Sequence, residues 1–128
     1  MKQIENVCVF LTGGTIYGLL EMFWRGHTHW SMVVAGGVAL LLLHALNEKL
    51  RARPLLLRCL IGAAIITSIE LVAGIIFNLW LGMNVWDYSE MSFNLLGQIC
   101  PMFTAVWFLI SIPAFYLSRT VRKFFDLI

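Results

Sequence analysis

The chain has 128 residues, of which 60% are hydrophobic and 12% are charged, with a net charge of +2 and a mean hydropathy of +0.85. A soluble domain carries about 25% charged residues, so a water-soluble globule of this composition would expose large apolar areas and aggregate. The composition therefore indicates an integral membrane protein. The basic residues form no stripe with interleaved aromatic residues, which argues against nucleic acid as a partner.

Four apolar runs are long enough to cross a hydrocarbon core, which takes about 20 residues of helix. They lie at about residues 4–24, 30–46, 55–81 and 96–118. The first run contains Glu21, and no small-residue cleavage site follows it, so we interpret it as a retained span and not as a signal peptide. The sequence predicts an all-α membrane protein, in which residues 1–128 form one domain, a bundle of four transmembrane helices.

The basic residues are unevenly distributed among the connections. Between the first two spans lies only Arg25, whereas the other eight fall on the opposite side if the chain crosses four times: Lys2, Lys49, Arg51, Arg53, Arg58, Arg119, Arg122 and Lys123. Cytoplasmic loops of membrane proteins carry an excess of lysine and arginine. We therefore expect both termini and the 47–58 loop to be cytoplasmic.

The outer connection between the third and fourth spans reads NVWDYSEMSFNLLGQ, residues 84–98. It carries Asp87 and Glu90 with no lysine or arginine nearby, and Trp86 and Tyr88 fit an aromatic belt at the headgroup level. The segment is too polar to span and too apolar to extend freely into water. We expect it to lie on the membrane face or to dip back into the bundle.

Two acidic residues lie well inside predicted spans, where a charged side chain is costly. Glu21 is one helical turn from Arg25, and an i,i+4 ion pair near the interface is the favoured interpretation. Glu70 has no partner nearby in the sequence. Two interpretations of Glu70 remain equally open, a hydrogen-bonded acid that holds helices together and an acid that handles ions or protons.

The sequence gives no support for a metal, a cofactor or catalysis. His27 and His29 have no acid or thiol at ligand spacing, and His44 alone is a poor haem ligand. The three cysteines lie far apart and mostly in apolar runs, which favours buried, inert thiols. No nucleophile–base pair and no phosphate-binding glycine loop is present, so we expect no enzymatic activity.

The outer segment resembles the signature of the bacterial ABC-transporter permease family of the CmpB type. The specific match is the WDYS–FN–G block, formed by Trp86, Asp87, Tyr88, Ser89, Phe93, Asn94 and Gly97. The third-span glutamate and an upstream pattern are also similar, at Tyr17, Gly18, Glu21, Trp24 and Glu70. The resemblance implies a small multi-span protein of the bacterial cytoplasmic (inner) membrane, with an ABC-type ATPase as a candidate partner. The 47–58 loop, however, is short and basic and contains no recognisable coupling helix.

The block also allows physical predictions about the outer segment. Asp87 and Asn94 can hydrogen-bond the first amides of the fourth helix, which lack intrahelical partners. Trp86, Tyr88 and Phe93 would then wedge the segment into the interface as a plug over the bundle. In a functional variant of this interpretation, Asp87 and Glu90 form an acidic vestibule that leads toward Glu21 and Glu70, the two in-span acids.

Two functions are consistent with these features. The first is a permease-like transporter or channel subunit that moves a small solute or ion past Glu70. The alternative is a non-transport membrane module, such as an accessory subunit, a lipid-binding protein or a holin-like pore former. Because four helices leave little room for a central path, we expect a homo-oligomer or an assembly with other membrane subunits.

Overall fold

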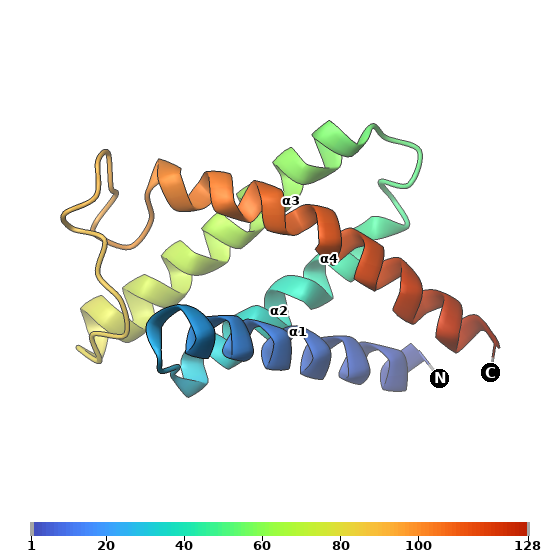
Figure 1. Ribbon diagram of the computed structural model, residues 1–128, viewed down its shortest axis with the longest axis horizontal. Helices are drawn as coiled ribbons and strands as arrows, with labels where there is room; N and C mark the ends of the chain where they lie inside the picture. Colours follow the sequence, from blue (N-terminus) through green and yellow to red (C-terminus); the bar gives the residue numbers. More distant parts are fainter. Residues whose placement is uncertain (1, 128) are drawn as a thin grey trace.

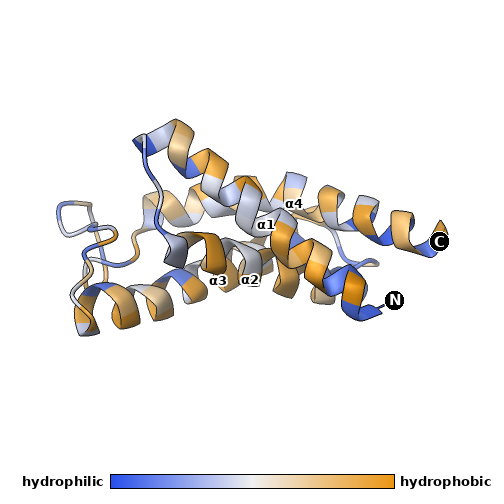
Figure 2. Cartoon of the chain, turned by 90° about the horizontal axis from the view of Figure 1, so that it is seen from below, coloured by the Kyte–Doolittle hydropathy of each residue, from blue (hydrophilic) through white to orange (hydrophobic). Residues whose placement is uncertain are grey.

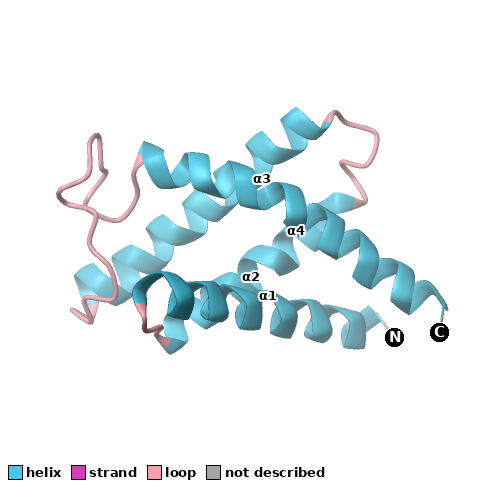
Figure 3. Ribbon diagram, viewed as in Figure 1, coloured by secondary structure: helices cyan, strands magenta, loops and turns pink. Residues whose placement is uncertain are grey.

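The computed structural model describes residues 2–127, which form four long helices and one shorter helical segment (Figure 1). Their bounds are α1 Lys2–Arg25, α2 Trp30–Asn47, α3 Leu55–Ala73, η1 Gly74–Trp80 and α4 Pro101–Leu127. With η1 continuing α3, four helices are long and apolar enough to cross a membrane. Figure 3 shows helices joined by loops, and no strand occurs within residues 2–127. The prediction of an all-α fold with four helices long and apolar enough to span a membrane is confirmed.

The fourth helix begins and ends later than the apolar run at 96–118 indicates. Leu96 and Gly97 have φ values of 57° and 70°, a left-handed conformation that a right-handed helix does not contain. The helix begins at Pro101, where the missing proline N–H would have no intrahelical partner in any case. It then continues as far as Leu127.

The helices form two pairs, α1 with α2 and α3 with α4. In Figure 1, α1 and α4 lie in front of α2 and α3, and the members of each pair cross at an angle. The second helix also packs against both α3 and α4, whereas α1 meets α4 only slightly. Helix α2 is therefore the element that joins the two pairs.

Glycine allows the close crossing of α1 and α2. A Cβ atom added at Gly13 would lie 2.6 Å from the Cβ of Leu40 and 2.8 Å from the carbonyl oxygen of Gly36. A Cβ atom at Gly37 would lie 2.8 Å from the carbonyl oxygen of Phe10. Small residues of this kind permit backbone approach where lipid supplies no hydrophobic drive for helix association.

The two ends of the bundle differ in charge. We call the end that carries both termini and the 48–54 connection the basic end, and the end that carries residues 26–29 and 81–100 the loop end. Figure 2 shows hydrophobic residues along all four helices and hydrophilic residues gathered at the loops and the N-terminal end. Outward-facing apolar side chains on the helices suit a hydrocarbon surrounding, among them Leu11, Leu19, Leu60, Val72 and Leu109.

Candidate functional site

The π-helical segment η1 fixes the start of the connection to α4. Its N–H groups bond to carbonyls five residues earlier, a geometry that is rare and occurs frequently at functional sites. Asn78 in this segment accepts a hydrogen bond from the Val85 N–H at 2.6 Å and donates one to Oε1 of Gln98 at 2.7 Å. A single side chain thus holds both ends of the 81–100 segment.

Trp86 places this segment against the bundle. Its indole is 7% exposed, donates to the carbonyl oxygen of Gln98 at 3.0 Å, and belongs to a core cluster with Met32 and Ala73. Trp86 and Val85 are buried, whereas most residues of the 84–98 segment are exposed. Phe93, by contrast, is 91% exposed and does not pack with Trp86.

The prediction that Asp87 and Asn94 cap the fourth helix is wrong. Oδ1 of Asp87 accepts from the Ser89 N–H at 2.8 Å, and this hydrogen bond holds the pKa of the exposed Asp87 carboxyl below its ordinary value. Oδ1 of Asn94 accepts from the Gly97 N–H at 2.9 Å. Both side chains close turns within the segment, and α4 begins only at Pro101.

Glu70 lies at the centre of the contacts that join the segment to the helices. The Tyr88 hydroxyl donates to its Oε2 at 2.8 Å, and Nε1 of Trp107 donates to its Oε1 at 3.2 Å. Burial raises the pKa of Tyr88, so the phenol keeps its proton and remains a donor. Within residues 2–127 no lysine, arginine or histidine forms an ion pair with Glu70.

A row of aromatic rings continues from this carboxyl group across the bundle. The ring of Tyr88 stacks on that of Phe103 with centroids 4.8 Å apart, and Phe103 lies 6.2 Å from Trp107. Trp107 in turn lies 6.0 Å from Tyr17 of α1. Aromatic pairs at these separations attract one another. The row connects the outer segment with α4 and α1, and Glu70 adds a contact to α3.

A cavity of about 500 Å³ lies between the two helix pairs, and Glu70 is part of its wall. The cavity is lined by residues of all four helices and by Trp86. Apart from Glu70, these lining residues are almost entirely apolar. Three lining residues are also exposed on the outside of the bundle, Ile16 and Leu20 on α1 and Pro113 on α4. The cavity therefore opens sideways between α1 and α4, where these two helices barely touch.

Glu21 has a different environment from Glu70. The predicted ion pair is present, with Nε of Arg25 2.8 Å from Oε2 of Glu21. Arg25 also donates to the carbonyl oxygen of Val85 at 3.0 Å, which attaches α1 to the 81–100 segment. Glu21 is buried but does not line the cavity, so the structure brings only one of the two in-span acids to this site.

The expected vestibule acids are Asp87 and Glu90, and both are exposed on the 81–100 segment. They do not line the cavity. Of the motif residues, Trp86 and Tyr88 reach inward to the cavity wall and to Glu70, while Ser89, Asn94 and Gly97 shape the turns of the segment.

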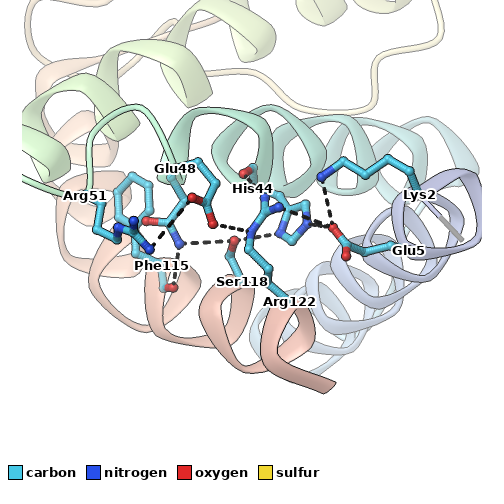
Figure 4. A network of polar contacts seen from close by, with 9 residues as sticks. Lys2, Glu5, His44, Glu48, Arg51, Phe115, Ser118 and Arg122 are labelled. Atoms are coloured by element: carbon cyan, nitrogen blue, oxygen red, sulfur yellow. Dashed lines mark hydrogen bonds and ion pairs between the residues drawn. The ribbon is translucent and has the colours of Figure 1, made fainter. Parts of the chain in front are cut away.

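A second buried polar cluster lies at the basic end (Figure 4). Nε2 of His44 is 2.7 Å from Oε2 of Glu5, and Nδ1 of His44 is 2.7 Å from the Ser118 hydroxyl. Arg122 donates to the carbonyl oxygen of His44 at 3.0 Å and lies 3.6 Å from Glu5. The cluster links α1, α2 and α4.

Sequence reasoning missed this cluster because it treated each residue alone. Glu5 precedes most of the first apolar run, and His44 suggested only a haem ligand to be rejected. The sequence does contain a signal for the pair. Glu5 and His44 both interrupt apolar runs at the same end of neighbouring spans, and a buried acid there needs a partner.

The histidine, cysteine and acidic side chains in the described part of the chain are not arranged as a metal centre. Within residues 2–127, no group of three or more histidine, cysteine, aspartate or glutamate side chains is placed to hold a metal ion. The three cysteines are free thiols, at Cys8, Cys59 and Cys100.

The arrangement of four spanning helices around an apolar cavity can be compared with known protein families. A family model described as "Putative ABC-transporter type IV" (ABC_trans_CmpB) matches residues 4–128. The chain belongs to this family. The match extends over all four spans, so membership in the ABC_trans_CmpB family rests on far more than the WDYS–FN–G block. No solved structure matches the chain.

Proposed function

We propose that the protein is a permease-like membrane subunit that binds small amphipathic cations in the cavity beside Glu70 and conducts them across the membrane. The observation that carries this proposal is a buried carboxyl group without a cationic partner within residues 2–127, facing a cavity of about 500 Å³. The proposal gives the protein no catalytic role.

The chemistry of the cavity supports a cation with an apolar body. Ligand pockets for small molecules have volumes of about 300–1,000 Å³ and combine apolar walls with few polar groups. Tyr17, Trp86 and Trp107 line the cavity, and the faces of aromatic rings attract cations. Each oxygen of Glu70 accepts one hydrogen bond and keeps lone-pair capacity for a ligand.

The charge distribution supports an orientation with the basic end in the cytoplasm of a bacterium, across the inner membrane. Both termini would then be cytoplasmic, and the 81–100 segment with Asp87 and Glu90 would face outward. In this orientation residues 1–128 would form one transmembrane domain.

The family name supports an ABC-type ATPase as a partner, but α2 and α3 are joined only by the turns at 48–54, with no coupling helix. An ATPase would have to dock on this short connection and the basic end of α4. Because the cavity opens sideways between α1 and α4, a second copy or another membrane subunit can complete its wall.

The sideways opening also favours a second candidate function, a lipid-binding or accessory module that does not transport. A cavity that opens between two spanning helices is accessible to an apolar chain directly from the bilayer. This candidate predicts binding at the cavity without movement of a solute across the membrane.

Tetraphenylphosphonium is a suitable probe for the first candidate, because it is an apolar cation. We expect Glu70→Gln to raise its Kd about 30-fold or more in calorimetric titrations of the purified protein, since a buried opposite charge contributes about 2 kcal/mol or more to binding. The matched control is Glu90→Gln, which removes a carboxyl group from the exposed part of the 81–100 segment and should raise the Kd far less than Glu70→Gln does.

A second variant keeps the proposal testable if Glu70→Gln does not fold. Ala39→Trp fills part of the cavity from α2 and keeps the Glu70 carboxyl group, and it should also abolish probe binding. If Glu70→Gln and Ala39→Trp both keep their helical circular dichroism and both bind the probe like wild type, the proposal is wrong. Probe binding without probe uptake into reconstituted vesicles would favour the lipid-binding or accessory module.

A further inference from the structure

A separate pocket at the basic end has the chemistry of an anion site. It has a volume of about 210 Å³ and lies between the C-terminal ends of α2 and α4. Four basic and two acidic side chains line it together with one amide: Arg51, Arg119, Arg122, Lys123, Glu48, Asp126 and Asn47. The formal charge of the lining is therefore 4 − 2 = +2.

The charges in this pocket are not all compensated internally. Arg122 is 3.0 Å from Glu48 and 3.6 Å from Glu5, and Arg51 lies 3.9 Å from Glu48 (Figure 4). Within residues 2–127, neither Arg119 nor Lys123 has a carboxylate at ion-pair distance. Two cations one helical turn apart on α4 thus remain available to an anion.

An amide oxygen adds a second, independent feature. Asn47 is 6% exposed, and its side-chain nitrogen donates to the Phe115 carbonyl oxygen and the Ser118 hydroxyl, both at 3.3 Å. Its Oδ1 is buried and has no hydrogen-bond partner within residues 2–127. A buried acceptor of this kind needs a donor, and a ligand hydroxyl can supply it.

The surface beside the pocket is apolar. At 100° per residue, Arg119, Arg122, Lys123 and Asp126 share one face of α4, and Tyr116, Phe124 and Leu127 occupy the adjoining face. These three side chains are 58%, 58% and 86% exposed. A lipid whose headgroup occupied the pocket would therefore have an apolar helix face beside it for its acyl chains.

We infer that this pocket binds the phosphate of an anionic phospholipid whose headgroup carries hydroxyl groups, of which phosphatidylglycerol is the simplest. The phosphate lies between Arg119 and Lys123, a headgroup hydroxyl donates to Oδ1 of Asn47, and the acyl chains follow the apolar face of α4. Basic pockets between membrane helices commonly hold lipid phosphates. The inference is independent of the cavity beside Glu70.

The test compares two double variants of the full chain that lose the same charge. Arg119→Gln with Lys123→Gln alters the pocket, whereas Lys49→Gln with Arg53→Gln alters exposed residues of the same end that do not line it. Binding of dioleoylphosphatidylglycerol to detergent-purified protein is measured by native mass spectrometry. We expect the first pair to weaken binding about 30-fold, since each cation near a lipid phosphate contributes about 1 kcal/mol, and the second pair to weaken it less than about threefold.

Equal losses in the two double variants would overturn the inference, because diffuse attraction to the basic end would then explain the binding. Equal retention of dioleoylphosphatidylcholine and dioleoylphosphatidylglycerol by wild type would also overturn it. Titration of inorganic phosphate distinguishes the two sources of the anion. Displacement of the lipid at millimolar phosphate would support the same site with free phosphate as its ligand, and persistence of the lipid supports the phospholipid.

Discussion

Replacement of His44 by leucine is expected to lower the free energy of unfolding by about 3 kcal/mol, because it removes the buried hydrogen-bond partner of both the Glu5 carboxyl group and the Ser118 hydroxyl. His44 is 1% exposed and lies 2.7 Å from both Glu5 and Ser118. Leucine fills much of the same volume but accepts and donates nothing. Unfolding in mixed detergent micelles, followed by helical circular dichroism, measures the change.

The double variant Glu5→Leu with His44→Leu separates two costs. One is the loss of the hydrogen bond itself, and the other is the cost of leaving the Glu5 carboxyl group buried without His44. Replacing a whole buried pair by apolar side chains is often nearly neutral, so the double variant should be more stable than His44→Leu alone. Arg51→Gln is the surface control, since the exposed pair of Arg51 and Glu48 should contribute less than about 1 kcal/mol. If His44→Leu costs no more than Arg51→Gln, the buried cluster does not stabilise the bundle.

The second large effect is expected from Gly37→Leu, which should separate α1 from α2. A single added Cβ at Gly37 would lie 2.8 Å from the carbonyl oxygen of Phe10 and 2.9 Å from its ring, so a leucine cannot be accommodated without moving a backbone. Overpacking costs about 1–3 kcal/mol and more where backbone must shift. We expect a loss at the upper end of this range or beyond it in the same micelle assay.

Ala45→Leu is the matched control for this substitution. Ala45 lies on the same helix and is exposed, so the added side chain meets lipid or detergent instead of α1. Its stability should stay within about 0.5 kcal/mol of wild type. Similar stabilities for Gly37→Leu and Ala45→Leu would mean that the close α1–α2 crossing is absent in the folded protein.

The spanning helices could be predicted from sequence because the cost of unpaired backbone groups in hydrocarbon leaves few alternatives to long apolar helices. The fourth helix was misplaced for a local reason. LLGQIC is apolar enough to extend a span, but Leu96 and Gly97 adopt positive φ and direct the chain into a turn. Hydropathy does not report backbone conformation.

Glu70 stands out in the sequence, since a lone acid in a span requires a special environment. Its partners Tyr88 and Trp107 were not predictable as partners. They lie 18 and 37 residues away, and their contact depends on helix rotation and on the path of the 81–100 segment. The pair of Glu5 and His44, 39 residues apart, was missed for the same reason.

Within the WDYS–FN–G block, the resemblance marked residues but did not assign their roles. Trp86 and Tyr88 enter the bundle, whereas Asp87 and Asn94 form turns and do not reach the fourth helix. Asp and Asn side chains bond equally well to helix amides and to turn amides. In this structure both side chains bond to turn amides, and α4 begins only at Pro101.

Because Arg25 is paired with Glu21, it adds little positive charge to the outer surface of the loop end. The exposed carboxylates of Asp87 and Glu90 therefore give that surface a net negative potential. Such a potential raises the local concentration of cations and accelerates their encounter with the protein, an effect that added electrolyte screens. The association rate of a cationic ligand should therefore fall steeply with ionic strength, while its residence time in the low-dielectric interior should change little.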